Sequence, residues 1–509
     1  MVIRDRIERS LQSNFDDSWL SSGTSKQIGC CGIFERYGDQ IVDGDIDGDW
    51  PDPIPGDNKT VLVIETGPSS ITATLNSFYD KEKKAESFIS YLFTSANSEE
   101  SLSSFFCRPL FQATASNLGF DDSVLSVYHY ENVPYQVEKQ RMNHEEAALE
   151  IITVLKASKL LNSIVVIGHR VSHGGGRFSA PAIINSGVVD DIKRISHIAQ
   201  KKNPHNIMGI ELMTKLLPSL PAVAVFDTAY HSAMPEKASV YALPKEIRDD
   251  LQIRRYGSNG TSLNYISCMA ESILRRKQMV LRGQAKSSFS SNFIVIRLDN
   301  EPCITAIVNG KPVDTSAGFF PGGGLVSGSK IGSIDPAIIS HIAKSKGITI
   351  EEAFTIIEND AGLKAISGGE EDIRVLIKRA KDNDIDSSLA VDMFVYKLAK
   401  EAASLLVACG GEVHALIFTN DLKDSNHELR EKIMHYLSPV FRVQVCPSRN
   451  KQDGKESEGI ISMKGKPTST LILVIPTQEE AMISLECKKQ MPHLFKSMER
   501  SSIRNFFLG

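Results

Sequence analysis

Short apolar runs, each long enough for one buried strand, recur along the chain from Thr60 onward. Val61–Ile64, Ile164–Ile167 and Ala222–Phe226 are unbroken apolar runs, which is typical of strands that are buried on both faces. After the second run, the glycine-rich stretch 168–176 predicts a loop. Together these runs predict the strands of one α/β block.

Helical patterns lie between the runs. Asn143, with Glu146 three residues later, forms a capping-box pattern and predicts a helix that begins near His144. Pro204 suits the first turn of a helix, and apolar residues then recur at helical spacing as far as Leu216. Alternation of strand and helix is typical of a sheet that is covered by helices.

A second block with the same alternation follows. Phe293–Leu298 and Ile304–Val308 predict two paired strands. Ala415–Phe418 and Leu471–Ile475 predict two more short strands, each followed by a polar loop and a helical pattern. We therefore expect an α/β protein of two lobes with a cleft between them.

The domain boundaries follow from where this patterning begins and ends. Residues 1–58 show no sustained periodicity and close with an acidic stretch rich in Gly and Pro. This composition predicts a loosely ordered arm or linker, which could contact a protein partner. We expect residues 59–250 to form the N-terminal lobe, 251–495 the C-terminal lobe, and 496–509 a tail.

Composition excludes several classes of protein. Hydrophobic residues make up 41% and charged residues 23% of the 509 residues, which is ordinary for a globular protein. The net charge of −5 does not favour nucleic-acid binding, and no apolar run is long enough to predict a membrane span. The eight cysteines include no pair at C-x-x-C spacing, and the first residues lack the apolar core of a secretory signal. We expect a cytoplasmic protein with reduced thiols.

Several short strings have specific sequences rather than general patterns. In chain order they are G-H-R-V-S-H-G-G at 168–175, F-D-T-A-Y-H at 226–231, R-R-Y-G at 254–257, V-D-T-S at 313–316, I-D-P-A at 334–337 and V-I-P-T at 474–477. Each resembles a string of the acetate kinase (acetokinase) family, and the order is the same. The resemblance extends from about Thr60 to about Lys489.

The resemblance implies a two-lobed acetate/sugar kinase and actin-like fold with an interdomain cleft. Such proteins transfer the γ-phosphoryl group of ATP to a short-chain carboxylate with the help of magnesium, and they form homodimers. ATP and Mg would then be the cofactors, a short-chain carboxylate the substrate, and a second copy of the chain the partner. Phosphoryl transfer needs positioned reactants and cations that neutralise the oxygens of the transferred group.

Five positions match functional residues of the family. Arg170 matches the arginine near the substrate carboxylate, where a planar guanidinium can hold a carboxylate with two bonds. Asp227 matches the acid that positions metal or nucleophile, and Glu479 the carboxylate associated with magnesium. Ser70 matches a serine of the first loop, and Asn300 the asparagine of the phosphate-binding turn. Each of these residue types also serves purely structural roles.

Other catalytic positions depart from the family. Glu65 stands where the family has asparagine in its first loop. Lys202 and Asn259 each replace a histidine, and the second of these histidines is the one expected to bind the phosphoryl group in flight. Lys330 replaces the catalytic arginine, so the charge is kept but the bidentate fork is lost. Lys202, Asn259 and Lys330 remain candidates for catalytic residues because they occupy these positions.

The nucleotide-binding positions depart as well. The family turn L-G-N-G reads Leu-Asp-Asn-Glu here, so that Asp299 and Glu301 replace two glycines that let the backbone approach phosphate. In the loop expected at adenosine, a glycine-rich string is replaced by residues that include Asp421. Carboxylates at these positions predict that MgATP binds weakly or not at all.

Three interpretations remain open. The first is a divergent acetate kinase family protein with little or no activity and a binding, scaffolding or regulatory role. The second is an active phosphotransferase with a different carboxylate or phosphoryl donor, which would use Lys202, Lys330 and Arg170 as its cations. The third is a conventional acetate kinase whose loops align differently. The intact strings on either side of the altered loops argue against the third.

Overall fold

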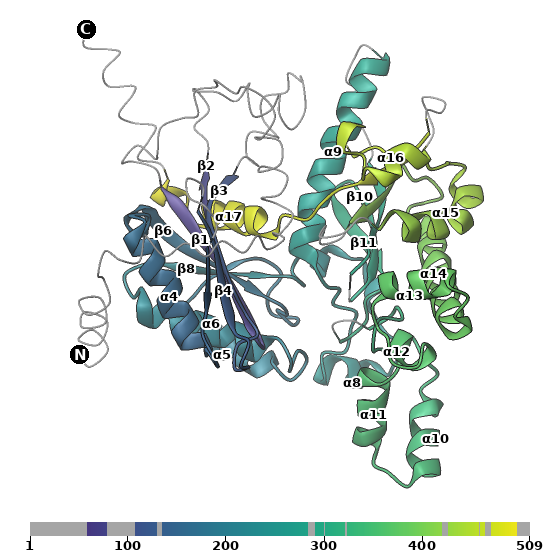
Figure 1. The fold of residues 1–509 in the computed structure, drawn as a ribbon, viewed down its shortest axis with the longest axis horizontal. Helices are drawn as coiled ribbons and strands as arrows, with labels where there is room; N and C mark the ends of the chain where they lie inside the picture. The colour runs from purple at the N-terminus through teal and green to yellow at the C-terminus, as the bar shows by residue number, and fades with distance from the viewer. Residues whose placement is uncertain are drawn as a thin grey trace.

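Two mixed sheets form the framework of the chain (Figure 1). The computed structural model describes residues 59–78, 107–129, 135–282, 291–299, 301–320, 323–419, 426–457, 459–463 and 470–495. Each sheet is packed against helices, so the two-lobed α/β fold expected from the sequence is confirmed. The N-terminal arm 1–58, with its suggested protein partner, and the tail 496–509 lie outside the described residues.

The first sheet has eight strands in the order β5-β4-β3-β2-β1-β6-β8-β7. Strands β1 to β5 pair antiparallel with one another, whereas β6 pairs parallel with both β1 and β8. The strands are β1 (Thr60–Gly67), β2 (Ser70–Phe78), β3 (Cys107–Ser116), β4 (Val124–His129), β5 (Tyr135–Glu138), β6 (Ile164–Val171), β7 (Ala182–Ile183) and β8 (Ala222–Phe226).

Alternate residues of β1 face two different helical layers. Leu62 and Ile64 pack in one buried cluster with residues of α4 and α6, while Val61 and Val63 pack in another with residues of α17. Because β1 is covered on both faces, its segment Val61–Ile64 is apolar at every position rather than alternating. The helices of this lobe's layers are α4 (His144–Ala157), α5 (Ser186–Ile195), α6 (Asn203–Leu216) and α17 (Glu479–Gln490).

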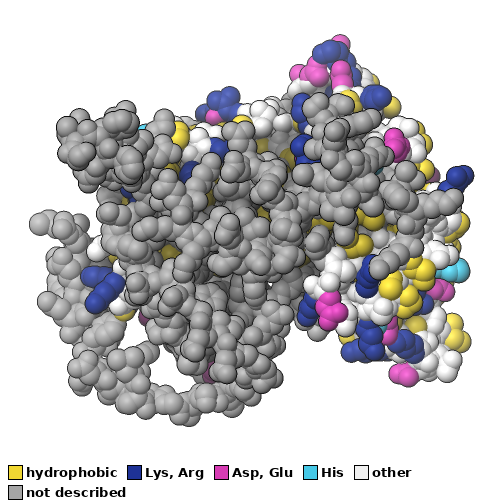
Figure 2. All heavy atoms as spheres, turned by 90° about the horizontal axis from the view of Figure 1, so that it is seen from above, with side chains coloured by type: hydrophobic (Ala, Val, Ile, Leu, Met, Phe, Trp, Pro, Cys, Tyr) yellow, Lys and Arg dark blue, Asp and Glu magenta, His cyan; other side chains and the backbone are white. Residues whose placement is uncertain are grey.

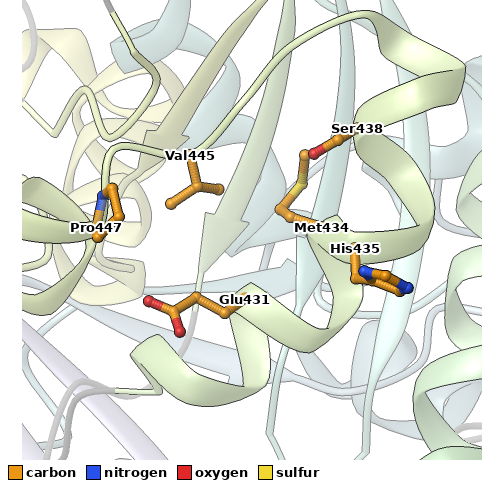
Figure 3. A pocket seen from close by; sticks show the side chains of 6 residues that line it. All are labelled: Glu431, Met434, His435, Ser438, Val445 and Pro447. Carbon is orange, nitrogen blue, oxygen red and sulfur yellow. The ribbon is translucent and has the colours of Figure 1, made fainter.

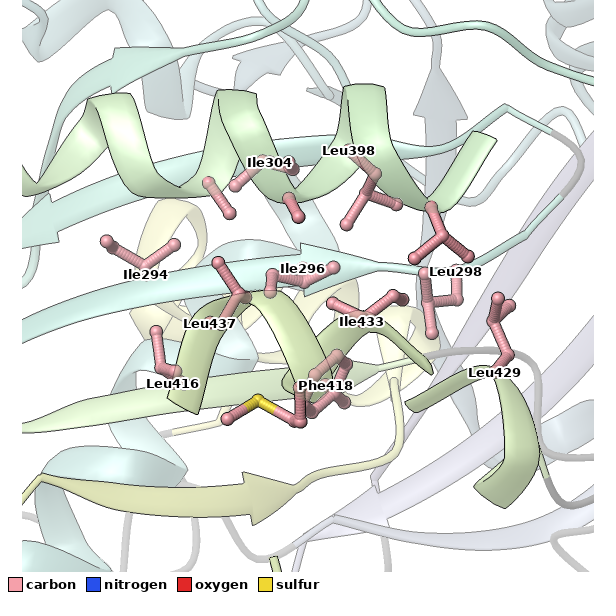
Figure 4. Packing of buried hydrophobic residues seen from close by; sticks show 14 of the residues in the cluster. Ile294, Ile296, Leu298, Ile304, Leu398, Leu416, Phe418, Leu429, Ile433 and Leu437 are labelled. Atoms are coloured by element: carbon pink, nitrogen blue, oxygen red, sulfur yellow. The ribbon is translucent and has the colours of Figure 1, made fainter. Parts of the chain in front are cut away.

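The second sheet has five strands in the order β11-β10-β9-β12-β13. Its central strand β9 pairs antiparallel with β10 and parallel with β12. Figure 4 shows the core on one face, where Ile294 and Ile296 of β9 pack between Leu398 of α14 and Ile433 of α15. The elements are β9 (Asn292–Arg297), β10 (Cys303–Val308), β11 (Lys311–Thr315), β12 (Ala415–Thr419), β13 (Leu471–Val474), α9 (Gly260–Arg282), α14 (Ile385–Ala408) and α15 (His427–Phe441).

Helix α17 contacts both sheets. Its Met482 and Leu485 pack with α9 and the second sheet, whereas Ile483 and Cys487 pack against the first. In β6, a Cβ on Gly168 would lie 2.6 Å from Cγ2 of Ile483 and 2.8 Å from Sγ of Cys487. Glycine is therefore needed for the close approach of α17 to this strand.

The loop predicted at 168–176 is wrong for its first four residues. Strand β6 continues through Gly168 to Val171, and the irregular segment begins only at Ser172. Gly168 marks a packing contact with α17 rather than a turn, which periodicity within one segment cannot reveal. The capping box at Asn143 and Glu146 is confirmed, and so is the helix that begins beside Pro204.

The remaining helices extend the second lobe away from the first sheet (Figure 1). Helix α11 begins with a second capping box, formed by Thr349 and Glu352. These helices and the short ones near residue 240 are α7 (Glu236–Ser239), α8 (Lys245–Asp250), α10 (Ala337–Lys346), α11 (Ile350–Asn359), α12 (Gly362–Ile366), α13 (Ile373–Lys381) and α16 (Pro447–Lys451).

The described surface visible in Figure 2 carries Lys and Arg side chains interspersed with Asp and Glu. Mixed charge of this kind matches the small net charge of the sequence. Among the described residues, none of the helices has the length and apolar character needed to cross a bilayer.

Candidate active site

Arg170 and Asp227 lie side by side at the carboxyl ends of two parallel strands. Arg170 is the second-last residue of β6, and Asp227 directly follows the last residue of β8. Nε and Nη2 of Arg170 lie 3.0 and 2.9 Å from Oδ2 of Asp227, while the hydroxyl of Thr261 donates to Oδ1 at 2.7 Å. Ligands bind at this end of the strands in α/β sheets, so this pair is where a site is expected.

A second carboxylate engages Arg170 from the neighbouring strand. Glu65, near the end of β1, accepts from Nη1 of Arg170 at 2.8 Å. Burial opposes the charge of the guanidinium, but the carboxylates of Asp227, Glu65 and Glu479 outweigh burial. They hold the pKa of Arg170 well above its usual value. All three nitrogens of this side chain lie within 3.0 Å of protein carboxylate oxygens.

Arg297 and Glu479 continue the site into the second lobe. Arg297 ends β9, and its Nη1 donates to Oε1 of Glu479 at 3.2 Å and to the hydroxyl of Ser262 at 3.1 Å. Burial raises the pKa of Glu479, but Arg170 and Arg297 outweigh this effect and the pKa is lowered. Glu479 is thus held as a carboxylate between two guanidinium groups.

The next residue, Glu480, behaves in the opposite way. Burial, with the neighbouring charge of Glu479, raises the pKa of Glu480 to about 7. The two adjacent acids at the start of α17 therefore differ in protonation at neutral pH, because the guanidinium groups stabilise mainly the charge on Glu479.

The side chains of Asp299 and Glu301 are both held by groups of the protein itself. Nε of Arg297 donates to Oδ2 of Asp299, and Oδ1 of Asp299 accepts from the backbone amide of Glu301 at 3.0 Å. Glu301 in turn accepts from Nζ of Lys202 at 2.6 Å and from Nζ of Lys330 at 2.9 Å. Burial alone would raise the pKa of Glu301, but the two ammonium groups lower it to about 2.

The candidate cations and anions thus gather at the place where the lobes meet, in a set of residues that we call the seam cluster. Asp227, Arg170 and Glu65 are joined in the first lobe, and the ion pairs of Arg297 and Glu301 extend across the second. Its members are Glu65, Asp227, Asp299, Glu301, Glu479, Arg170, Lys202, Arg297 and Lys330.

Two other candidates, Asn259 and Ser70, are neutral and lie outside these ion pairs. Asn259 precedes α9 with φ of 54°, and its amide lies 3.4 Å from Oγ of Ser258 and 3.8 Å from Sγ of Cys303. Ser70 begins β2 and pairs with Gly67 across the hairpin. Asn300 and Asp421 lie outside the described residues.

Buried histidines do not replace the missing cationic imidazole. His169 precedes Arg170 and His231 lies in the segment after Asp227, and both are at most 2% exposed. Burial lowers the pKa of His169 to about 3 and that of His231 to about 4. Both rings are therefore neutral at pH 7 and cannot offset negative charge on a phosphoryl group.

Sequence reasoning missed three residues of this site. Thr261 was given no role, although its hydroxyl donates to Asp227. Arg297 directly follows the apolar run Phe293–Ile296, and an arginine in a buried strand is a signal of a buried ion pair. Glu480 follows a residue that was singled out, and the two differ because the guanidinium groups of Arg170 and Arg297 stabilise mainly the charge of Glu479.

Metal binding finds little support in the described residues. They contain no group of three or more His, Cys, Asp or Glu side chains placed to hold a metal ion. Glu479 accepts from Arg297, and Asp227 accepts from Arg170 and Thr261, so both acids already have cationic or hydroxyl donors. The arrangement does not fit a magnesium site, and no step through the metal follows from it.

A separate pocket lies on the far part of the second lobe. It has a volume of about 330 Å³ and is bounded by α15 and the segment that leads into α16 (Figure 3). Its lining residues are Glu431, Met434, His435, Ser438, Val445 and Pro447, none of which belongs to the seam cluster.

Two helix-covered α/β lobes, with charged residues gathered at the strand ends between them, define a protein of the two-lobed kinase class. Residues 60–485 match the Acetokinase family, and the chain belongs to this family.

Relatives match over nearly their whole length. The chain is 35% identical over 399 residues to an acetate kinase of Thermosipho melanesiensis, covering 77% of this chain and 94% of the relative. Its structure is similar to that of a propionate kinase from Francisella tularensis, with a TM-score of 0.70, 31% identity and coverage of 84% of this chain and 98% of the other. An acetate kinase from Porphyromonas gingivalis gives a TM-score of 0.68 and 27% identity over 86% and 100% of the two chains.

Proposed function

We propose that this chain is an acetate kinase family protein in which ATP-dependent formation of acyl phosphates is weak or lost, and which acts by binding in a regulatory or scaffolding role. The observation that carries the proposal is the contact between Arg170 and Glu65. The family resemblance assigns Arg170 to the substrate carboxylate, and a protein carboxylate already lies 2.8 Å from its Nη1.

A carboxylate substrate would have to displace Glu65 and then remain close to it. Two like charges about 4 Å apart repel by about 1 kcal/mol in water and about 4 kcal/mol at an effective dielectric near 20. The side chain of Glu65 is 45% exposed, so solvent screening brings the repulsion towards the lower value. Even that value lowers substrate affinity several-fold, because about 1.4 kcal/mol corresponds to a factor of ten.

Charge balance also disfavours an anionic nucleotide. The seam cluster contains five carboxylates and four cationic side chains among the described residues, so it offers no excess of positive charge. Asn259 supplies a neutral amide where a phosphoryl-binding imidazole is expected. Loss of one such donor typically reduces turnover by about 10² to 10³.

The test is an assay that traps acyl phosphates with hydroxylamine, with MgATP and either acetate or propionate as substrates. We expect turnover far below the ordinary enzymatic range of about 1 to 10³ s⁻¹. An acetate kinase from one of the bacterial relatives, assayed in parallel, serves as the positive control. Turnover within the ordinary range would overturn the proposal.

A second candidate is an active phosphotransferase with a different carboxylate or phosphoryl donor. It is favoured by the pairing of Arg170 with Asp227 and by the positive charges of Lys202 and Lys330. Calorimetry with ATP, ADP and pyrophosphate, each with and without magnesium, separates the two candidates. Nucleotide that remains bound after purification would favour the second, and homodimer formation is expected in either case from the family.

A further inference from the structure

Glu301 joins two lysines that come from different lobes. Lys202 lies immediately before α6 in the first lobe, whereas Lys330 lies in the segment before α10 in the second. One carboxylate oxygen of Glu301 is 2.6 Å from Nζ of Lys202, and the other is 2.9 Å from Nζ of Lys330. Each oxygen therefore has its own ammonium group, as in the binding of a compact anion between two cations.

The position of Glu301 is itself fixed by neighbouring residues. Its backbone amide donates to Asp299 at 3.0 Å, and Arg297 holds Asp299 in place. Lys201, which precedes Lys202, makes a second contact between the lobes: its Nζ donates to Oδ1 of Asn359 at 3.1 Å. The ion pairs of Glu301 are thus part of an ordered seam rather than an isolated surface contact.

We propose that Lys202 and Lys330 form a cradle for phosphoryl oxyanions that spans the two lobes, and that Glu301 is its built-in occupant, an autoinhibitory contact that an incoming anion must displace. Glu301 offers two anionic oxygens from a fixed attachment, so it competes at a high local concentration with any free ligand. The apparent affinity of the cradle is reduced by the fraction of time that Glu301 occupies it.

Isothermal titration calorimetry with inorganic pyrophosphate at low salt and without metal tests this proposal, with ADP as a second probe. For Glu301→Gln, which keeps the shape but removes the charge, we expect pyrophosphate to bind at least about tenfold more tightly than it binds the unmodified protein. Tighter binding of ADP than of pyrophosphate would mean that the base is also recognised, whereas equal binding identifies the phosphoryl groups as the recognised part.

The gain must depend on the two lysines. In Glu301→Gln combined with Lys202→Met, or combined with Lys330→Met, we expect the gain to disappear. Glu428→Gln is the matched control, because Glu428 accepts from Lys381 at 2.6 Å on a different part of the second lobe. This control should leave pyrophosphate binding unchanged.

Two results would overturn the proposal. One is a Glu301→Gln protein that binds pyrophosphate no more tightly than the unmodified protein, and the other is a gain that survives loss of the lysines. If Glu301→Gln does not fold, Glu301→Asp replaces it, and its shorter side chain should give a smaller gain by releasing one lysine. The readout is anion binding, so a failure here would leave the proposed loss of acyl phosphate formation standing.

Discussion

Arg170 contacts Asp227 with two nitrogens, which lie 3.0 and 2.9 Å from the same carboxylate oxygen. The two side chains are only 14% and 7% exposed, so removal of one charge leaves the other buried without its partner. For Asp227→Asn we expect a loss of about 3 kcal/mol in the free energy of unfolding, measured by urea denaturation. Asp249→Asn, which breaks an exposed pair with Lys245, should cost less than about 0.5 kcal/mol. Equal losses in the two variants would contradict this prediction.

The acid Glu301 should contribute stability that is lost at low pH. Its pKa is about 2 in the folded protein and 4.5 in the unfolded reference, so the unfolded chain binds more protons between these values. The contribution is complete above pH 4.5 and decreases as the pH falls towards 2. We expect the difference in unfolding free energy between the unmodified protein and Glu301→Gln to shrink over this window in urea titrations. A difference that is independent of pH would show that the carboxylate is not stabilised by its lysines.

The contribution of Glu480 to stability should change with pH in the opposite direction to that of Glu301. Its folded pKa of about 7 lies above the unfolded value of 4.5, so the folded protein binds more protons over this interval. Stability is therefore lost as the pH rises from 4.5 to 7. Compared with Glu480→Gln, the unmodified protein should become progressively less stable across this range and then reach a constant difference. Parallel stability curves for the two proteins would contradict the raised pKa.

A methyl group at residue 168 should disturb the packing of α17. For Gly168→Ala we expect a loss of about 1 to 3 kcal/mol in unfolding free energy, because the new Cβ would overlap Ile483 and Cys487. Gly176→Ala is the control, since the nearest atom to its Cβ would be 3.9 Å away. Adding Cys487→Ala to Gly168→Ala should recover part of the loss. No recovery would point to the strand backbone, rather than the helix contact, as the origin.

Nucleotide binding should improve when the family glycines are restored. In Asp299→Gly with Glu301→Gly, two carboxylates leave the seam cluster, and Lys202 and Lys330 are released from Glu301. We expect MgATP to bind about tenfold more tightly than to the unmodified protein, which corresponds to about 1.4 kcal/mol. Calorimetry at constant ionic strength measures this change. Tight binding by the unmodified protein that is weakened by the two glycines would identify these carboxylates as metal ligands.

The adjacency of Arg170 and Asp227 was predictable, whereas the partners of the lysines were not. Arg170 and Asp227 lie at the carboxyl ends of two parallel strands, and such ends meet at one edge of a sheet. Glu301 lies 99 residues from Lys202 and 29 from Lys330, and their contact depends on how two lobes meet. No pattern within one segment encodes that geometry. The sequence therefore predicted that the carboxylate of Glu301 would face the phosphates, and did not predict its pairing with the two lysines.

Strand prediction succeeded where both faces of a strand carry apolar side chains and failed where polar residues alternate with them. The apolar runs that became β1, β6 and β8 were recognised because helices cover both of their faces. The antiparallel strand Ser70–Phe78 alternates Thr, Ser and Asn with apolar residues, and it was not assigned from its sequence. Its position is fixed by pairing with β1 and β3, which is a long-range property.

The place of α17 between the two sheets has a consequence for the order in which the chain acquires its structure. On the ribosome, every strand of both sheets emerges before residues 479–490 do. Until then, the described part of the chain offers no helix to cover the face of the first sheet that carries Val61 and Val63, and the face of the second that meets Leu485 is covered by α9 alone. The cores of both lobes therefore stay incomplete until this one late helix has packed against them, and both depend on it for protection from aggregation.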